Sequence, residues 1–116
     1  PEEIEVEEGE ERQLAEVSIF DLIRAFQNVL KRFEDEDELN EIYDDRWTVG
    51  DKIDHLLKKV EPGETMKFSA LFEAASSNGE VIVTFLAMLE LMKLNHFRVQ
   101  QDTHLGEIEL QRSENS

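Results

Sequence analysis

The stretch that decides the fold is EVIVTFLAMLELMKL, residues 80–94. Only four of its fifteen residues are polar: Glu80, Thr84, Glu90 and Lys93. A surface helix of a small globular protein shows one apolar stripe and one solvated face, but these polar residues do not form one clean solvated face. The stretch therefore predicts a helix that is covered on most of its sides, and the question is what covers it.

Helical spacing divides the apolar side chains of this helix between two kinds of contact. Val81, Phe85, Leu89 and Met92 share one face and are predicted to fill the domain's own core, with Leu86 beside them. The side chains left for other sides are Ile82, Val83, Ala87, Met88, Leu91 and Leu94. Burial of the whole set within the domain is the alternative, because such residues are usually core residues. A domain of about 70 residues rarely buries a helix all round, so a covering protein partner is the preferred interpretation.

The segments around this helix predict a winged-helix domain over residues 47–112. Upstream, RWTVGDKIDHLLKKVEPGE predicts a helix that begins after Thr48, has Asp51 in capping position and stops at Pro62-Gly63. ETMKF predicts a short strand, and FSALFEAA predicts a short helix. Downstream, FRVQQ and GEIELQR alternate apolar and polar residues, which predicts a hairpin. The fold class is mostly α with a small β-hairpin, in the order of a helix-turn-helix unit with an attached β-ribbon.

An amphipathic helix is predicted before this domain, at residues 17–33. Ser18 and Asp21 have the spacing of a capping box. An isolated helix of this length is marginal in water, so it must dock onto something. Residues 1–16 are half glutamate and predict a disordered tail. Residues 34–46 predict an extended acidic linker because their charges repel one another, and residues 113–116 form a short tail.

The charge and the residue usage exclude several classes of function. The chain has 28 acidic and 12 basic residues, for a net charge of −16, and sixteen of the acids fall in residues 1–16 and 34–45. The negative electrostatic field of such a chain disfavours contact with free nucleic acid and with anionic membranes. The chain has no cysteine, its start is unlike a signal peptide and no apolar run is long enough to span a bilayer. These features predict a soluble cytoplasmic protein.

Residues that carry enzyme chemistry are scarce, so neither catalysis nor a cofactor is expected. The sequence has no thiol, no glycine-rich phosphate loop and no nucleophile elbow. A zinc site of His96, His104 and Asp102 would match no tight ligand spacing, so ordinary surface histidines are preferred. A DNA-reading helix needs Arg, Lys, Asn or Gln on its outer face, and residues 80–94 offer only Lys93. A winged-helix transcription regulator or DNA-binding domain acting as a dimer is the alternative function.

The stretch FSALFEAASSNGEVIVTFLAMLELMKLNHFRVQQDTHLGEIEL resembles the C-terminal winged helix of the bacterial kleisin family, segregation and condensation protein A. The positions that carry the resemblance are Glu80, Val81, Thr84 to Ala87, Leu89 to Leu91, Gln100 or Gln101, Gly106 and Ile108. SIFDLIRAFQNVLKRF also resembles the helix before the family's linker, and RWTVGDKIDHLL resembles the first helix of its winged helix. The resemblance covers residues 17–111 and does not include the family's N-terminal domain.

The resemblance implies a non-catalytic subunit of the complex that condenses and segregates the chromosome, associated with the nucleoid. In that family the C-terminal winged helix docks on the ATPase head of an SMC subunit, and the middle segment binds a dimer of segregation and condensation protein B. The expected contacts with the SMC head are Met88, Leu91, Leu105 and Ile108. The residues expected to contact the B subunit, or to fold back locally, are Ile19, Leu22, Phe26, Val29 and Phe33.

Overall fold

The structure is a computed structural model that describes residues 17–37, 46–101 and 107–115. The predicted tail at residues 1–16, residues 38–45 of the predicted linker, and Leu105 lie outside these residues. The elements, in chain order, are α2 (Ile19–Asp37), α3 (Val49–Lys59), β1 (Thr65–Lys67), the 3-10 helix η1 (Phe68–Phe72), α4 (Asn78–Lys93), β2 (Phe97–Gln101) and β3 (Ile108–Arg112). The part of the chain that the structure describes is mostly helical with one small sheet, as predicted.

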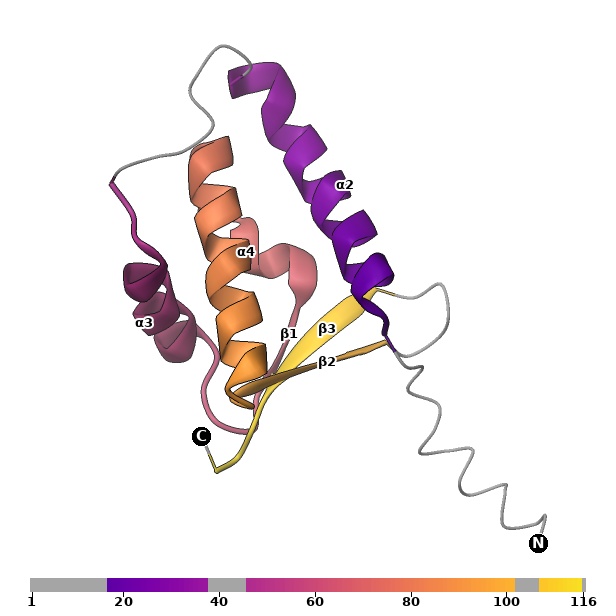
Figure 1. The fold of residues 1–116 in the computed structure, drawn as a ribbon, viewed down its shortest axis with the longest axis vertical. Coiled ribbons are helices and arrows are strands. Elements are labelled where there is room, and N and C mark those ends of the chain that lie inside the picture. The colour runs from indigo at the N-terminus through magenta and orange to yellow at the C-terminus, as the bar shows by residue number, and fades with distance from the viewer. Residues whose placement is uncertain (1–16, 38–45, 102–106, 116) are drawn as a thin grey trace, which may run out of the picture.

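The helix α4 runs between α3 and α2, and the sheet lies across one end of this layer (Figure 1). The three antiparallel strands have the order β1-β3-β2, so the predicted hairpin of β2 and β3 is extended by the short strand β1. The register places Val99 opposite Leu110, and Leu110 opposite Met66. This element order and this sheet make the fold winged-helix-like.

Local hydrogen bonds fix where the helices begin. At α2, the Ser18 N–H donates to Asp21 Oδ2 at 3.1 Å, and the Asp21 N–H donates to Ser18 Oγ at 3.2 Å. Thr48 and Asp51 make the same reciprocal pair at α3, at 3.1 and 3.0 Å. Each box satisfies two backbone donors that a helix start would otherwise leave unpaired. Both predicted capping boxes are confirmed.

The end of α2 differs from the prediction. The helix continues for four residues beyond Phe33, to Asp37, although residues 34–37 were expected to belong to an extended linker. Glutamate has nearly the helix propensity of lysine or arginine, and extending a helix that already exists costs far less than nucleating one. The like-charge repulsion within these four residues is therefore too weak to end the helix at Phe33.

The exposure of α4 corrects the predicted division of its side chains. Met88 is fully buried and Leu91 is 1 % exposed, whereas Leu86, expected beside the core, is 46 % exposed. The physical reason is that α3, α2, η1 and β2 all pack against α4, so the core covers more than half of its circumference. Met88 and Leu91 were therefore wrongly placed on the outer side, and Ile108, at 6 % exposure, is likewise a core residue.

The amphipathic helix α2 docks onto the rest of the chain through its apolar face. Leu22 and Val29 are 2 % and 3 % exposed. The Phe26 ring stacks on Phe85 of α4, with centroids 4.0 Å apart and an interplanar angle of 13°, and lies 6.2 Å from Phe72 of η1. Stacked aromatic pairs contribute about 0.5–1.5 kcal/mol beyond the area that they bury. The helix is thus part of the folded domain and contributes to its core.

Replacing Phe26 tests this docking. Phe26→Ala is expected to lower the free energy of unfolding by about 3 kcal/mol, because it removes a packed ring and leaves space against Phe85 and Phe72. Phe20, on the same helix but 71 % exposed, is the matched control, and Phe20→Ala is expected to change stability by less than about 0.5 kcal/mol. Urea denaturation of both variants makes the comparison, and equal effects would show that α2 is not docked.

Candidate protein-binding surfaces

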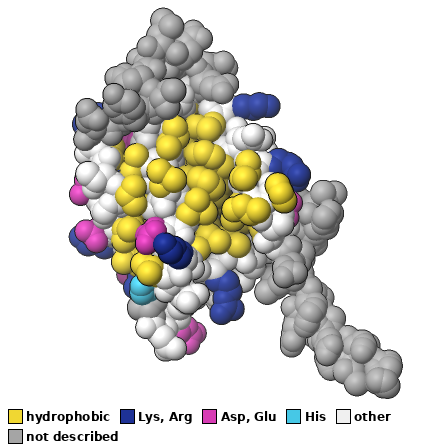
Figure 2. Space-filling model, in the orientation of Figure 1, with side chains coloured by type: hydrophobic (Ala, Val, Ile, Leu, Met, Phe, Trp, Pro, Cys, Tyr) yellow, Lys and Arg dark blue, Asp and Glu magenta, His cyan; other side chains and the backbone are white. Residues whose placement is uncertain are grey.

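One broad face of the molecule is apolar. On α4, the side chains of Ile82, Leu86 and Leu89 follow helical spacing and remain partly or fully exposed, and Leu94 just beyond the helix is 52 % exposed. The flanking helices add the partly exposed residues Ile53 and Leu57 of α3 and Ile23 and Leu30 of α2. Figure 2 shows hydrophobic side chains gathered over these three helices. We call these eight residues the three-helix apolar surface.

A second group of exposed apolar residues lies at the start of α2. Ile19, Phe20 and Ile23 are 51 %, 71 % and 42 % exposed, and together they form the α2 outer cluster. Large apolar side chains that stay in water as a group are typical of surfaces that bind another molecule. Further along the helix, Gln27, Asn28, Leu30 and Lys31 line a shallow open hollow.

The structure separates the residues that the sequence grouped as interfaces. Of the five expected B-subunit contacts, Leu22, Phe26, Val29 and Phe33 pack against the core, and Ile19 alone is exposed. The structure therefore has the local fold-back that the sequence left as one of two alternatives. Of the expected SMC-head contacts, three are core residues, as described above, and Leu105 is outside the described residues. Contact with either partner stays a prediction.

A buried ion pair connects α3 to the first turn of α4. Lys52 Nζ lies 2.6 Å from Glu80 Oε2, and both side chains are about 95 % buried, with 5 % and 6 % exposure. Glu80 Oε1 also accepts hydrogen bonds from the Ser76 N–H and hydroxyl, at 3.0 and 3.2 Å. The Trp47 ring centroid is 4.0 Å from Lys52 Nζ. Both charges are therefore compensated inside the protein, where an unpaired charge would be costly.

Sequence reasoning did not find this pair, although a signal for Lys52 exists. Lys52, Leu56 and Val60 follow one another at intervals of four residues, so Lys52 shares the buried stripe of α3. Its partner comes from an element 28 residues away. A lysine in an apolar stripe needs such a partner, but the sequence does not say which carboxylate supplies it.

The pair sets the ionisation of Glu80. Burial alone would raise the pKa of the Glu80 carboxyl, but the hydrogen bonds from Lys52 and Ser76 and the charge of Lys52 outweigh it, so the pKa lies below its ordinary value. One turn further along α3, desolvation, followed by the charges of Lys52 and Lys59, lowers the pKa of His55. Glu80 is therefore ionised at neutral pH and acts as the structural counter-ion of Lys52.

Among the described residues, no group of three or more His, Cys, Asp or Glu side chains could hold a metal ion. His104 and Asp102, which the sequence offered as zinc ligands with His96, lie outside these residues. A polar hollow beside the sheet is lined partly by Arg98 and Arg112. Arg112 donates hydrogen bonds to the carbonyl oxygens of Leu57 and Val60, at 2.7 and 3.0 Å, and so caps the end of α3.

No helix within the described ranges is long and apolar enough to cross a membrane.

The fold defines a winged-helix-like domain with an exposed apolar face. The family model for segregation and condensation protein ScpA matches residues 2–113. The chain is 32 % identical, over 98 % of its length, to segregation and condensation protein A of Clostridium tetani, and 35 % identical, over 89 %, to that of Lactococcus lactis. It is 36 % identical, over 85 %, to that of Myxococcus xanthus. The chain belongs to the segregation and condensation protein A family of bacterial kleisins, which confirms the resemblance seen in the sequence.

The chain covers 47 %, 43 % and 35 % of these three relatives, so it spans less than half the length of each of them. No solved structure matches it. The relatives' printed names refer to segregation and condensation.

Removing one partner of the buried pair tests its structural role. Lys52→Met is expected to lower the free energy of unfolding at pH 7 by about 3 kcal/mol, because it leaves the Glu80 carboxylate buried without its cation. The matched control is Arg24→Ala, which breaks a surface pair with Asp21 at 3.4 Å and is expected to cost less than about 0.5 kcal/mol. Urea denaturation measures both. A loss for Lys52→Met no larger than for the control would contradict the assigned role.

The lowered pKa of Glu80 predicts a pH dependence. The unfolded chain takes up this proton near the ordinary pKa of 4.5, whereas the folded chain does so only at lower pH. The stabilisation is therefore complete above that value and is lost as the pH falls through the folded pKa. Glu80→Gln is expected to be less stable than the parent at pH 7 and to lose less stability on acidification. Denaturation at pH 7, 5 and 3 compares them, and parallel curves for the two chains would be the contrary result.

Proposed function

We propose that this chain is the C-terminal part of a non-catalytic kleisin subunit that acts in chromosome condensation and segregation at the cytoplasmic nucleoid. Its winged-helix domain binds the ATPase head of an SMC protein, and α2 binds the dimer of segregation and condensation protein B. The proposal rests on family membership and on one structural observation, the three-helix apolar surface, which the domain leaves partly exposed.

The outer side of α4 supports a protein partner rather than DNA. In a DNA-binding winged helix, the corresponding helix presents Arg, Lys, Asn or Gln to base edges and phosphates. Here the outer side presents Ile82, Leu86 and Leu89, and its charged residues are Glu90 and Lys93. An apolar surface of this kind gains free energy when it is removed from water. The SMC-head contact is therefore assigned to the exposed residues of α4, in place of the buried Met88 and Leu91.

Calorimetry of the whole 116-residue chain against an isolated SMC head of the same organism tests this function. Binding is expected to persist at high salt, because the contact is mainly apolar and exposed charges are screened. Leu86→Glu, at an exposed position, is expected to weaken binding by at least about tenfold, because it places a carboxylate in the interface while leaving the core intact.

Lys67→Glu provides the control, since Lys67 is exposed on β1 and outside the three-helix apolar surface. This variant is expected to bind like the parent. No binding by a folded parent chain would exclude the SMC-head function. Equal binding by the parent and Leu86→Glu would retain the function but move the contact to another face.

A further inference from the structure

The apolar face of α2 is already occupied inside the domain. Leu22 and Val29 are buried against the core, and Phe26 is stacked on Phe85 of α4 at 4.0 Å. A partner could reach these side chains only by pulling α2 away from the domain and exposing the phenylalanines beneath it. The surface of α2 that is free while the helix stays docked is its outer side.

That outer side carries an apolar group of its own. The α2 outer cluster consists of Ile19, Phe20 and Ile23, and Phe20 is the most exposed of the large hydrophobic side chains in the described residues, at 71 %. The cluster is separate from the core contacts, and Ile23 connects it to the three-helix apolar surface. An aromatic side chain flanked by two β-branched ones offers the kind of anchor that dominates protein interfaces.

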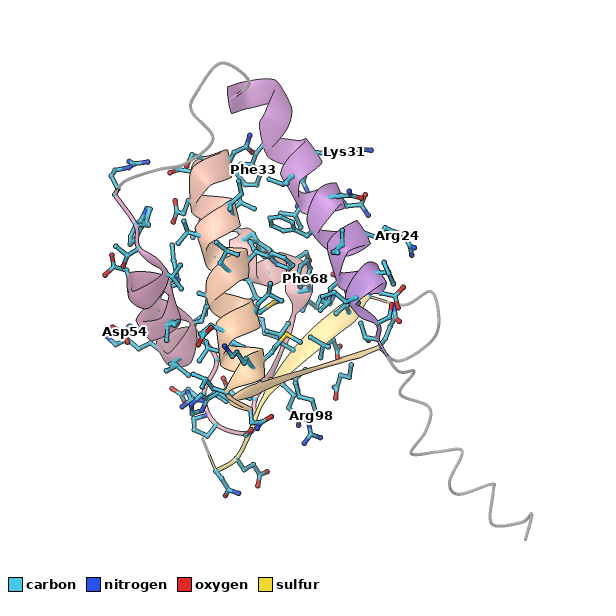
Figure 3. All side chains as sticks on the ribbon, in the orientation of Figure 1. Arg24, Lys31, Phe33, Asp54, Phe68 and Arg98 are labelled. Carbon is cyan, nitrogen blue, oxygen red and sulfur yellow. The ribbon has the colours of Figure 1, made fainter. Side chains whose placement is uncertain are left out.

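Cations adjoin this cluster. Between Ile19 and Phe33, α2 has three basic residues against the single acid Asp21, with which Arg24 pairs at 3.4 Å, whereas the last four residues of the helix, 34–37, are all acidic. Phe20, Arg24, Gln27 and Lys31 follow one another at helical spacing along the outer side. Figure 3 shows Arg24 and Lys31 projecting from α2 away from α4. Up to Lys31, the outer side of α2 is thus an apolar anchor followed by two cations, Arg24 and Lys31.

We propose that α2 binds its protein partner through this outer side while it remains docked on α4. The partner supplies an apolar pocket for Phe20 and Ile23, with carboxylates beside it that face Arg24 and Lys31. This inference rests on the proposed function in taking the segregation and condensation protein B dimer as that partner. It differs from the sequence-based expectation, in which the inner residues Leu22, Phe26, Val29 and Phe33 make the contact.

An acidic protein surface fits this combination better than the other anions that a cationic helix attracts. Phosphate backbones would leave Ile19, Phe20 and Ile23 in water, and the charge of −16 repels polyanions over long range. A membrane surface binds helices that can immerse a whole apolar face, and here the largest apolar face of α2 is packed on α4. A pocket rimmed by carboxylates buries the apolar side chains of the α2 outer cluster and pairs with the cations Arg24 and Lys31.

The test is calorimetry of the whole 116-residue chain with the B-subunit dimer from the same organism. Phe20→Glu and Ile23→Glu are each expected to weaken binding by at least about tenfold. Reversal of both cations, in Arg24→Glu with Lys31→Glu, is expected to weaken binding at low salt and to reduce its salt dependence. The matched control is Asp54→Lys, on the exposed side of α3 away from α2 (Figure 3), which is expected to bind like the parent.

Hydrogen exchange on the same complex distinguishes the two faces of α2. If the helix stays docked, its amides and those of α4 around Phe85 keep or increase their protection when the partner binds. Binding that survives Phe20→Glu and Ile23→Glu, with faster exchange around Phe85, would overturn the inference while leaving the B-subunit function in place. No binding by the folded parent chain would overturn the B-subunit function and the inference together. Binding of the parent to anionic phosphatidylglycerol vesicles that Phe20→Glu abolishes would overturn it in favour of a membrane contact.

Discussion

Phe26 of α2 lies flat on Phe85 of α4, with the two ring centroids 4.0 Å apart, and this contact holds α2 against the rest of the domain. Phe85 also meets the edge of Phe68, which in turn contacts Phe72, so rings from α2, η1 and α4 form one cluster. Without α2, the remaining three rings would face water on the side that the helix now covers. The contact therefore decides which side of α2 is inside and which is free for a partner.

The local parts of this fold are readable from the sequence because short-range interactions encode them. Ser18 with Asp21 and Thr48 with Asp51 each place a hydroxyl and a carboxylate three residues apart, which defines a helix start without reference to the rest of the chain. The strands β2 and β3 likewise follow from alternation of apolar and polar residues. The element order, and with it the family resemblance, depends only on such signals.

Features that depend on distant contacts were not predictable in the same way. Periodicity shows that Met88 and Leu86 lie on different sides of α4, but only the packing of α3, α2 and η1 decides that Met88 is inside. Similarly, Lys52 lies on the apolar stripe of α3, and its burial depends on Glu80 across the interface between two helices. The end of α2 at Asp37 reflects cooperative extension of a helix that docking had already stabilised. The side chains that stay exposed are those left over after all these contacts are made, which is why sequence periodicity alone could not separate exposed from buried positions.

The order in which a ribosome makes these elements has a consequence for the young chain. The segment of α2 is synthesised first, and the ring of Phe85 on which Phe26 stacks follows about 60 residues later, which corresponds to roughly 3 to 12 seconds at 5–20 residues per second. During that interval the apolar face of α2 has no α4 to dock on, and an isolated helix of this length is marginal in water. The emerging chain therefore carries Leu22, Phe26 and Val29 as an open hydrophobic segment. Such transiently exposed hydrophobic surface is prone to aggregation, and it is buried only after α4 has been made.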